Sequence, residues 1–93
     1  MIRSFADEDT EHLFFSGKSR RFNAILAVAR RRLQVLDNTS YLDDLRVPPG
    51  NRLEALKGDR KGQHSIRIND QYRICFRWDK GDAYEVEIVD YHR

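Results

Sequence analysis

The chain has 93 residues, of which 40% are hydrophobic and 11% aromatic, and this composition predicts one small folded domain over residues 1–93. Its formal net charge is only +2, and its single cysteine excludes an internal disulfide and fits a reducing cytosol. No apolar run approaches membrane-spanning length and no signal-peptide pattern opens the chain, so we expect a cytoplasmic protein without a membrane partner. The sequence also lacks zinc-spaced Cys or His clusters and a glycine-rich phosphate loop, so we expect no metal and no cofactor.

The N-terminal part of the chain carries the signals of two helices, after a short edge strand over residues 1–5. Asp7 is a favoured N-cap residue and Gly17 a natural C-cap, so the first helix should lie between them. A second helix should run from Ser19 to about Leu36, because apolar residues recur at helical spacing and would cover a sheet. These apolar residues are Phe22, Ile25, Leu26, Ala29, Leu33 and Leu36.

Cations gather on the outer side of this second helix. They are Arg20, Arg21, Arg30, Arg31 and Arg32. The simplest interpretation is a solvated helix face, and the alternative is contact with a polyanion or an acidic partner.

A connector over residues 37–50 should contain one helical turn, from Tyr41 to Leu45, capped by Thr39 or Ser40. Two prolines and a glycine, residues 48–50, then end any helix and lead into a sheet. The switch from helical to strand periodicity near residue 50 predicts an α+β domain. We expect its two N-terminal helices to pack on one face of a small antiparallel β-sheet.

Strand alternation begins at His64. Apolar residues occupy every second position, first at residues 66 and 68 and then at residues 72, 74, 76 and 78, so one face of each strand should meet the core. His64 shares this core parity, whereas Arg67, Arg73 and Arg77 belong to the opposite, open face. The turn before His64, residues 58–62, carries Arg60 and Lys61.

The turn between these two strands follows from parity, because residues opposite each other in an antiparallel pair share a face. A three-residue loop over residues 69–71 pairs Ile66 with Ile74, whereas a two-residue loop would pair Ile66 with Arg73. The longer loop sets Arg67 opposite Arg73. Like charges placed so cost stability, and an anion between them would offset the cost, which hints at a phosphate ligand.

The last strand should span residues 82–89, after a three-residue loop over residues 79–81. Tyr84, Val86 and Ile88 would then lie on the core face. In this register Tyr72 faces Ile88, and Arg73 faces Glu87, so a simple cross-strand ion pair is one explanation of Arg73. Cys75 lies on the open face without a histidine partner, and we assign it no catalytic role.

The chain ends with Asp90, Tyr91 and His92, beside the end of the strand that carries Arg73. A carboxylate, a phenol, an imidazole and a guanidinium within reach of one another would form an acid–base site that also holds a phosphate. From spacing alone, Asp-Tyr-His at the end of a chain is a weak signal, and a frayed tail without a role explains these three residues better than an active site does.

Short segments from the two halves of the chain form a more specific pattern together. They are residues 2–5 (IRSF), 53–62 (LEALKGDRKG), 65–69 (SIRIN), 72–74 (YRI), 81–83 (GDA) and 90–92 (DYH). With the two predicted helices, this pattern resembles the HigB toxins, which belong to the RelE/ParE superfamily of type II toxin–antitoxin systems. The resemblance covers nearly the whole chain and implies a RelE-like fold.

The resemblance implies a toxin that cuts messenger RNA in the decoding site of the ribosome without a metal ion, with the RNA 2′-hydroxyl as nucleophile. It also implies a HigA-like helix-turn-helix antitoxin that neutralises the toxin and represses their operon, so that operator DNA is contacted only through the antitoxin. By the same resemblance, His92 is the general acid or base, Asp90 its neighbour in proton transfer, and Tyr91 stacks on or orients a nucleotide.

The resemblance also implies that two further residues, Arg73 and Lys57, stabilise charge on the phosphate. In a plain meander, however, Lys57 would lie on the order of 15–20 Å from Asp90, at about 3.3 Å per residue. Some described HigB toxins carry histidine where this chain has Glu54, which still offers a base. We expect RNA or ribosome contacts from Arg60, Lys61 and Arg67, and ribosome or antitoxin contacts from Arg30 and Arg31.

Two alternatives stay open at this point. ParE-like members of the superfamily inhibit DNA gyrase and would not need the terminal acid–base group. A non-catalytic RNA- or ribosome-binding module would use the helix arginines equally well, because phosphate contacts are independent of sequence.

Overall fold

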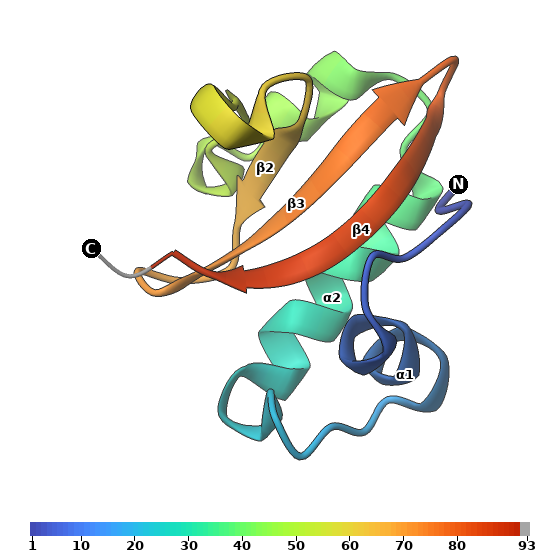
Figure 1. Cartoon of the computed structure of the whole chain (residues 1–93), viewed down its shortest axis with the longest axis vertical. Helices are drawn as coiled ribbons and strands as arrows, with labels where there is room; N and C mark the ends of the chain where they lie inside the picture. Colours follow the sequence, from blue (N-terminus) through green and yellow to red (C-terminus); the bar gives the residue numbers. More distant parts are fainter. Residues whose placement is uncertain (92–93) are drawn as a thin grey trace.

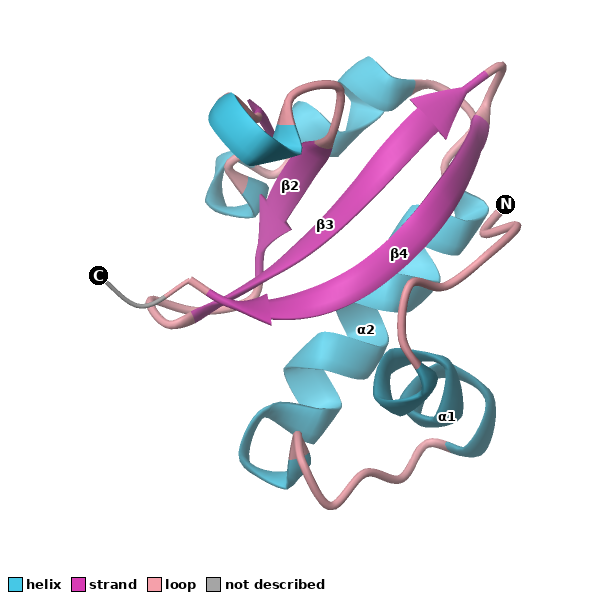
Figure 2. Cartoon of the chain, viewed as in Figure 1, coloured by secondary structure: helices cyan, strands magenta, loops and turns pink. Residues whose placement is uncertain are grey.

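A four-stranded antiparallel sheet forms one layer of the molecule, and helices form the other (Figure 1; Figure 2). The computed structural model describes residues 1–91. The strands lie in the order β1-β2-β3-β4, and both α-helices contact β4. The predicted α+β class is therefore confirmed. The elements are α1 Glu8–Ser16, α2 Leu26–Asn38, β1 Glu54–Ala55, β2 His64–Arg67, β3 Tyr72–Asp79 and β4 Asp82–Asp90, with 3-10 turns η1 Asn23–Ile25, η2 Leu42–Arg46, η3 Pro49–Asn51 and η4 Gly58–Arg60.

Both predicted ends of the first helix are confirmed. The carboxylate of Asp7 accepts a hydrogen bond from the backbone N–H of Thr10 at 3.2 Å, which caps the N-terminus of α1. At the other end Gly17 is left-handed (φ 72°) and donates its N–H to the carbonyl of Leu13. Local sequence signals were sufficient here.

The predicted start of the second helix is wrong. Ser19 accepts a hydrogen bond from the N–H of Phe22 at 2.9 Å, but α2 begins only at Leu26, after η1. The backbone is not α-helical at Phe22 (φ −109°, ψ 24°) or at Ile25 (φ −117°, ψ 12°), and both side chains are buried in the core. Placing these two side chains in the core outweighs the local preference for a continuous helix.

One hydrophobic core joins the helices to a single face of the sheet. Helix residues such as Leu13, Ala29 and Leu33 are fully buried against Ile74 and Phe76 of β3. The other fully or largely buried members are Phe22, Ile25, Leu36, Leu45, Ile66, Ile68, Ala83, Val86 and Ile88. The opposite face of the sheet is thereby left for polar and charged groups.

The predicted edge strand at the N-terminus is reduced to two isolated parallel bridges, Ile2 to Ala83 and Phe5 to Val86, both on β4. The terminal amino group and the guanidinium of Arg3 both lie within 3.3 Å of the Asp82 carboxylate. These contacts fix the first residues of the chain along the outer edge of β4.

The predicted register of the β2–β3 hairpin is confirmed. Ile66 lies opposite Ile74 and Arg67 opposite Arg73. The side chain of Asn69 closes the loop, because its oxygen accepts hydrogen bonds from the N–H groups of Gln71 and Tyr72 at 2.8 and 2.7 Å.

The predicted register of the β3–β4 hairpin is wrong. Its loop has two residues, Lys80 and Gly81, both at positive φ (49° and 85°), a geometry that matches the twist of the flanking strands. A β-bulge follows, where the register shifts between Cys75 and Arg77 and Glu85 adopts a φ of 53°.

The short turn and the bulge both change the open face. Because of the two-residue turn, Tyr84 lies opposite Arg77 on that face rather than in the core, whereas Val86 and Ile88, after the bulge, remain buried as predicted. Further along the hairpin, Arg73 lies opposite Val89 instead of Glu87, and Tyr72 lies opposite Asp90 instead of Ile88.

His64 lies on the core face, as predicted, with its ring stacked on Phe76 at a centroid distance of 6.1 Å. Its Nδ1 is buried and has no hydrogen-bond partner among residues 1–91. Burial, followed by the positive charge of Arg46, lowers the pKa of His64 below its ordinary value of 6.5.

We predict that His64 makes the fold less stable in acid. A lowered folded-state pKa means that the unfolded chain binds more protons, so this stability is complete above pH 6.5 and is lost as pH falls through that value toward the folded-state pKa. Thermal melting at a series of pH values should show a smaller acid-induced drop in melting temperature for His64→Phe, which keeps the ring contact, than for the original chain. Equal drops would show that His64 does not contribute.

Candidate active site

Arg73 lies on the open face of the sheet, near the start of β3 and beside the β2–β3 loop. Its Nε donates a hydrogen bond to Ser65 Oγ at 2.8 Å, and one Nη donates to the carbonyl of Arg52 at 2.6 Å. The other Nη lies 3.7 Å from a carboxylate oxygen of Glu54. The guanidinium is therefore held by groups from β1, β2 and the segment before β1.

This arrangement corrects two predictions about Arg73. We expected an exposed arginine, yet the residue is only 8% exposed. The proposed ion pair with Glu87 is also wrong, because the two-residue turn and the bulge together place Glu87 opposite Cys75 and leave Arg73 opposite Val89. Arg73 is a fixed cation that has its own set of partners.

Glu54 does lie beside Arg73, as the site prediction requires. It is paired with Ser65 across β1 and β2, and its side chain is 52% exposed. At 3.7 Å this carboxylate is attracted to the guanidinium but is too far for a hydrogen bond. Glu54 therefore lies beside Arg73 with about half of its side chain open to solvent.

Tyr91 and Asp90 meet the site from the end of β4. The Tyr91 ring lies over the Arg73 guanidinium, and the distance from the Arg73 Cζ atom to the ring centroid is 5.8 Å. The backbone N–H of Tyr91 donates a hydrogen bond to the carbonyl of Gln71 at 2.6 Å. Asp90 accepts a hydrogen bond from the side chain of Gln71 at 3.1 Å. The structure thus brings Asp90 and Tyr91 to the strand end that carries Arg73, whereas the predicted acid–base residue His92 lies outside the described residues.

The expected clash between Arg67 and Arg73 is relieved without an external anion. Arg67 forms an ion pair with Asp70 at 2.5 Å, and Arg73 has Glu54. The register alone is therefore no argument for a bound phosphate. Arg67 remains a partly exposed cation at the edge of the site.

A second charged pair covers the middle of the open face. Arg60 donates to Glu87 at 2.7 Å and to Gln63 at 3.0 Å, and the hydrogen bond to Glu87 is the main cause that raises the pKa of Arg60. Beneath this layer Cys75 is fully buried, and burial raises the pKa of its thiol. A protonated, buried thiol is a poor nucleophile, in agreement with the absence of a catalytic assignment for Cys75.

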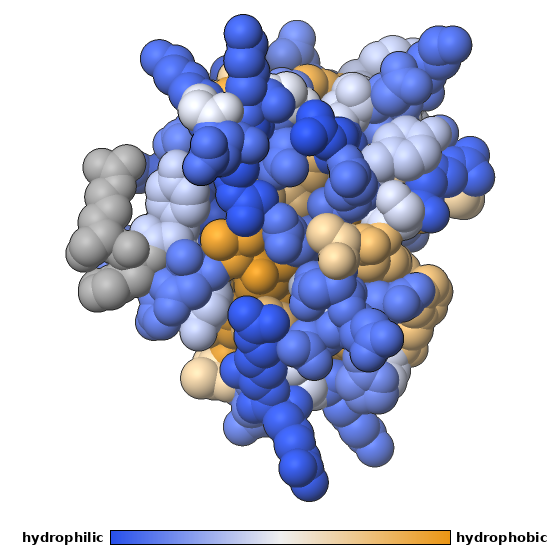
Figure 3. All heavy atoms as spheres, viewed as in Figure 1, coloured by the Kyte–Doolittle hydropathy of each residue, from blue (hydrophilic) through white to orange (hydrophobic). Residues whose placement is uncertain are grey.

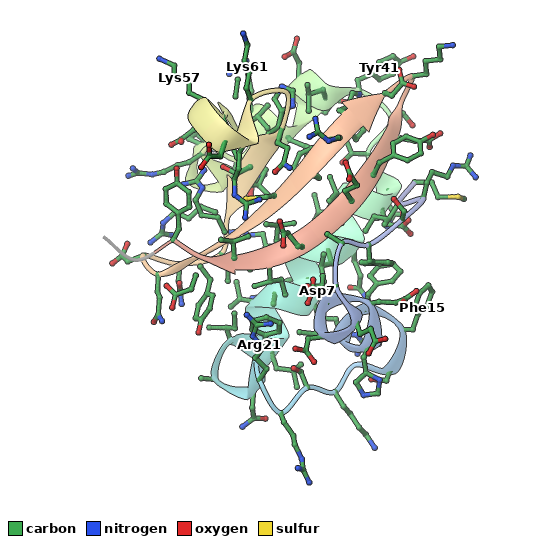
Figure 4. All side chains as sticks on the ribbon, viewed as in Figure 1. Asp7, Phe15, Arg21, Tyr41, Lys57 and Lys61 are labelled. Atoms are coloured by element: carbon green, nitrogen blue, oxygen red, sulfur yellow. The ribbon has the colours of Figure 1, made fainter. Side chains whose placement is uncertain are left out.

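The lysines on either side of η4 extend into solvent (Figure 4). Lys57 and Lys61 are exposed on either side of η4, and Figure 4 shows both side chains extending from the molecule at the end of the sheet that carries this turn. The neighbour Leu56 is buried and anchors the strand. The role of Lys57 at the phosphate, which the resemblance implies, remains a prediction.

The helix arginines do not form one set. Arg30 and Arg31 are exposed on α2, so their predicted contact with a ribosome or an antitoxin remains a prediction. Arg32, by contrast, donates to the side chain of Asn51 at 2.8 Å and ties α2 to η3. Arg21 lies in the segment before η1, where it pairs with Asp9 at 3.2 Å.

Sequence reasoning missed two groups of the site, Ser65 and the carbonyl of Arg52. Ser65 could have been predicted, because the confirmed register places it on the open face, diagonally opposite Arg73 on the neighbouring strand. The Arg52 carbonyl carries no such signal, since a left-handed backbone (φ 46°) at Arg52 sets its direction.

Within the described residues no group of three or more His, Cys, Asp and Glu side chains is arranged to hold a metal ion. None of the helices described there is long and apolar enough to cross a membrane.

We predict that Arg73→Ala destabilises the fold by about 1–3 kcal/mol, because it leaves the buried Ser65 hydroxyl without its partner. Urea unfolding should show this loss. The matched control is Arg67→Ala, whose exposed ion pair is worth about 0–1 kcal/mol. Equal stability of the two variants would mean that water replaces the guanidinium at no cost.

The chain has close relatives by sequence. Residues 3–92 match the family described as RelE-like toxin of type II toxin–antitoxin system HigB. Toxin HigB-1 of Vibrio cholerae is 41% identical over 85 residues, which cover 89% of this chain and 90% of that protein. Endoribonuclease HigB of Proteus vulgaris is 34% identical over 93 residues, which cover 99% of this chain and 100% of that protein.

Solved structures show the same fold at much lower identity. A mutant of YafQ from E. coli superposes with a TM-score of 0.65 at 11% identity, covering 98% of this chain and 92% of that one. A YoeB–YefM complex from Staphylococcus aureus gives a TM-score of 0.61 at 20% identity, covering 100% and 97%. The fold is RelE-like, as the resemblance implied, and the sequence matches show that this chain belongs to the HigB-like toxin family of type II toxin–antitoxin systems.

Proposed function

We propose that this toxin is a ribosome-dependent endoribonuclease that cuts translated mRNA by metal-independent acid–base catalysis. The observation that supports it best is the Arg73 guanidinium, held by Ser65 and the Arg52 carbonyl below the Tyr91 ring and beside the Glu54 carboxylate. A fixed cation, an aromatic ring and a movable carboxylate are the groups that phosphate cleavage in a nucleotide chain needs. The relative named Endoribonuclease HigB supports the same activity.

In the proposed reaction the 2′-hydroxyl of one nucleotide attacks its own 3′-phosphate. A base takes the 2′-proton, the bond to the 5′-oxygen of the next nucleotide breaks, and an acid gives that oxygen a proton. The products are a 2′,3′-cyclic phosphate and a free 5′-hydroxyl. The catalyst must therefore move two protons and balance negative charge on the phosphate between them.

Arg73 is suited to stabilise the negative charge that develops on the phosphate. Its anchoring hydrogen bonds keep the guanidinium in place before RNA binds, so little reorganisation is needed as charge develops. The longer 3.7 Å contact with Glu54 is the one that a phosphate would replace. Releasing Glu54 in this way frees a carboxylate beside the phosphate, where it can act as the base.

The remaining roles fall to the chain end. We assign proton transfer to His92, whose imidazole titrates near neutral pH, with Asp90 as its neighbour. Tyr91 would stack on a nucleotide and keep it over Arg73. The exposed cations Lys57, Lys61 and Arg67, with Arg60 beside them, would contact RNA around this centre rather than take part in the chemical step.

The proposed partners are the ribosome, its bound mRNA and a HigA-like helix-turn-helix antitoxin, with operator DNA reached only through the antitoxin, in the cytoplasm. The YoeB–YefM structure shows a toxin of this fold in complex with its antitoxin.

Cleavage of mRNA on purified ribosomes, mapped by primer extension, tests the proposal. We expect discrete cuts within translated frames, and a rate about 10²–10⁴-fold lower for His92→Gln, since glutamine keeps a hydrogen bond but does not titrate. Lys80→Glu, at the far end of the β3–β4 hairpin, is the control. A wild-type protein that leaves mRNA intact but causes gyrase-linked DNA damage would replace the proposal with a ParE-like activity, and binding without either effect would indicate an RNA-binding module.

Charge reversal on α2 tests the ribosome contact separately. Arg30→Glu combined with Arg31→Glu should weaken ribosome or antitoxin binding, more at low salt than at high salt, while leaving single-turnover cleavage at saturating ribosome nearly unchanged. Normal binding to both partners at low salt would show that this helix face is only solvated.

A further inference from the structure

Three phenylalanine rings form a ledge along the outer side of α1. The centroid distances are 5.6 Å from Phe5 to Phe14, 5.1 Å from Phe14 to Phe15 and 5.9 Å from Phe5 to Phe15. Phe15 is 71% exposed and ends the ledge in solvent. Figure 4 shows this side chain pointing outward from α1, and the space-filling view shows apolar atoms on the same edge of the molecule (Figure 3).

The ledge is fixed to the fold rather than loosely attached. Phe5 is held on β4 by its bridge to Val86, and Phe5 and Phe14 are partly buried against the core. The exposed ring of Phe15 rests edge-on against Phe14 at an interplanar angle of 76°. A rigid, exposed aromatic ring with supported neighbours is typical of an interface hot spot, because little entropy is lost when a partner covers it.

A hollow of about 550 Å³ lies beside Phe15. Three carboxylates line it together with His12, namely Glu8, Asp9 and Glu11. Asp9 pairs with Arg21, whereas Glu8 and Glu11 form no ion pair within residues 1–91. The hollow therefore combines an aromatic edge with two carboxylates that have no ion-pair partner among residues 1–91, which suits the side chain of a lysine or arginine.

The negative charge beside the ledge determines which kind of partner can bind there. Phosphates of RNA or of an anionic membrane would be repelled by Glu8 and Glu11. A second copy of this chain is also disfavoured, because a two-fold contact places the same patch on both sides and so sets these carboxylates against themselves. A basic protein segment remains, and a toxin of a type II system has a protein antitoxin as its partner.

We propose that the ledge and the hollow are the docking site of the antitoxin, which would contribute an aliphatic side chain against Phe15 and a lysine or arginine between Glu8 and Glu11. This inference rests on the part of the proposed function that gives the toxin a protein antitoxin, and it does not depend on RNA cleavage.

The test uses the purified antitoxin encoded beside the toxin gene and measures its dissociation constant by calorimetry. Phe15→Ala should weaken binding at least about 30-fold, as expected for a hot-spot ring. Glu8→Gln with Glu11→Gln should weaken it less and reduce its salt dependence. The matched control is Tyr41→Ala, which removes an aromatic ring that is 73% exposed elsewhere on the surface and should leave the dissociation constant unchanged.

Each other outcome has a definite meaning. Full-strength binding by Phe15→Ala, or no binding by the wild-type toxin, overturns the inference. It is also overturned if the free toxin is a dimer that Phe15→Ala dissociates, since the ledge is then a self-contact. If wild-type toxin fails to cut RNA on ribosomes but binds the antitoxin through Phe15, the nuclease proposal falls and this one stands.

Discussion

The buried guanidinium of Arg73 is the interaction on which the sheet side of this molecule depends. A charge taken out of water must be hydrogen-bonded, or the fold loses several kcal/mol. The required partners come from β2, through Ser65, and from the chain before β1, through the Arg52 carbonyl. This requirement explains why Arg52 tolerates a left-handed backbone, which costs of order 1–3 kcal/mol for a residue other than glycine.

The turn and the β-bulge of the β3–β4 hairpin together decide what Arg73 is free to do. In the predicted hairpin, with a three-residue loop and no bulge, Glu87 would lie opposite Arg73 and pair with it directly. The two-residue turn and the extra residue at Glu85 each shift the register by one residue, so that Glu87 lies opposite Cys75 and pairs with Arg60 instead. Arg73 is left with a half-exposed carboxylate, from Glu54, that an incoming phosphate can displace. The short turn and the bulge thus separate a structural ion pair from a cation available for chemistry.

The sequence was sufficient where one local signal determines the structure. Asp7 and Gly17 mark both ends of α1, and the face parity of Ile66 with Ile74 determines the β2–β3 register. It was insufficient where segments distant in the chain decide together. The residues around the Lys80-Gly81 turn are equally compatible with a three-residue loop over residues 79–81. No residue type near Glu85 indicates a bulge.

The same limit applies to the site. Strand alternation was sufficient to predict which residues lie on the open face. Arg73, Glu54 and Tyr91 do come together there. The burial of Arg73 could not be read, because it requires a carbonyl from one segment, a hydroxyl from another and a ring from the chain end. Alternation identifies which side a residue faces, but it does not say what covers that side.

β4 is the one strand that connects the two surfaces discussed above. Its centre holds Phe5, a part of the aromatic ledge, through the bridge at Val86, and its end leads into Asp90 and Tyr91 beside Arg73. Coupling between two sites requires an element with two arrangements whose balance both ligands shift. β4 is paired with β3 from Tyr72 to Asp79 across one bulge and is closed by a two-residue turn, so the structure shows one arrangement of this strand. An antitoxin on the ledge would therefore act through the bulk that it adds to the helical layer, without rearranging Arg73 and its partners.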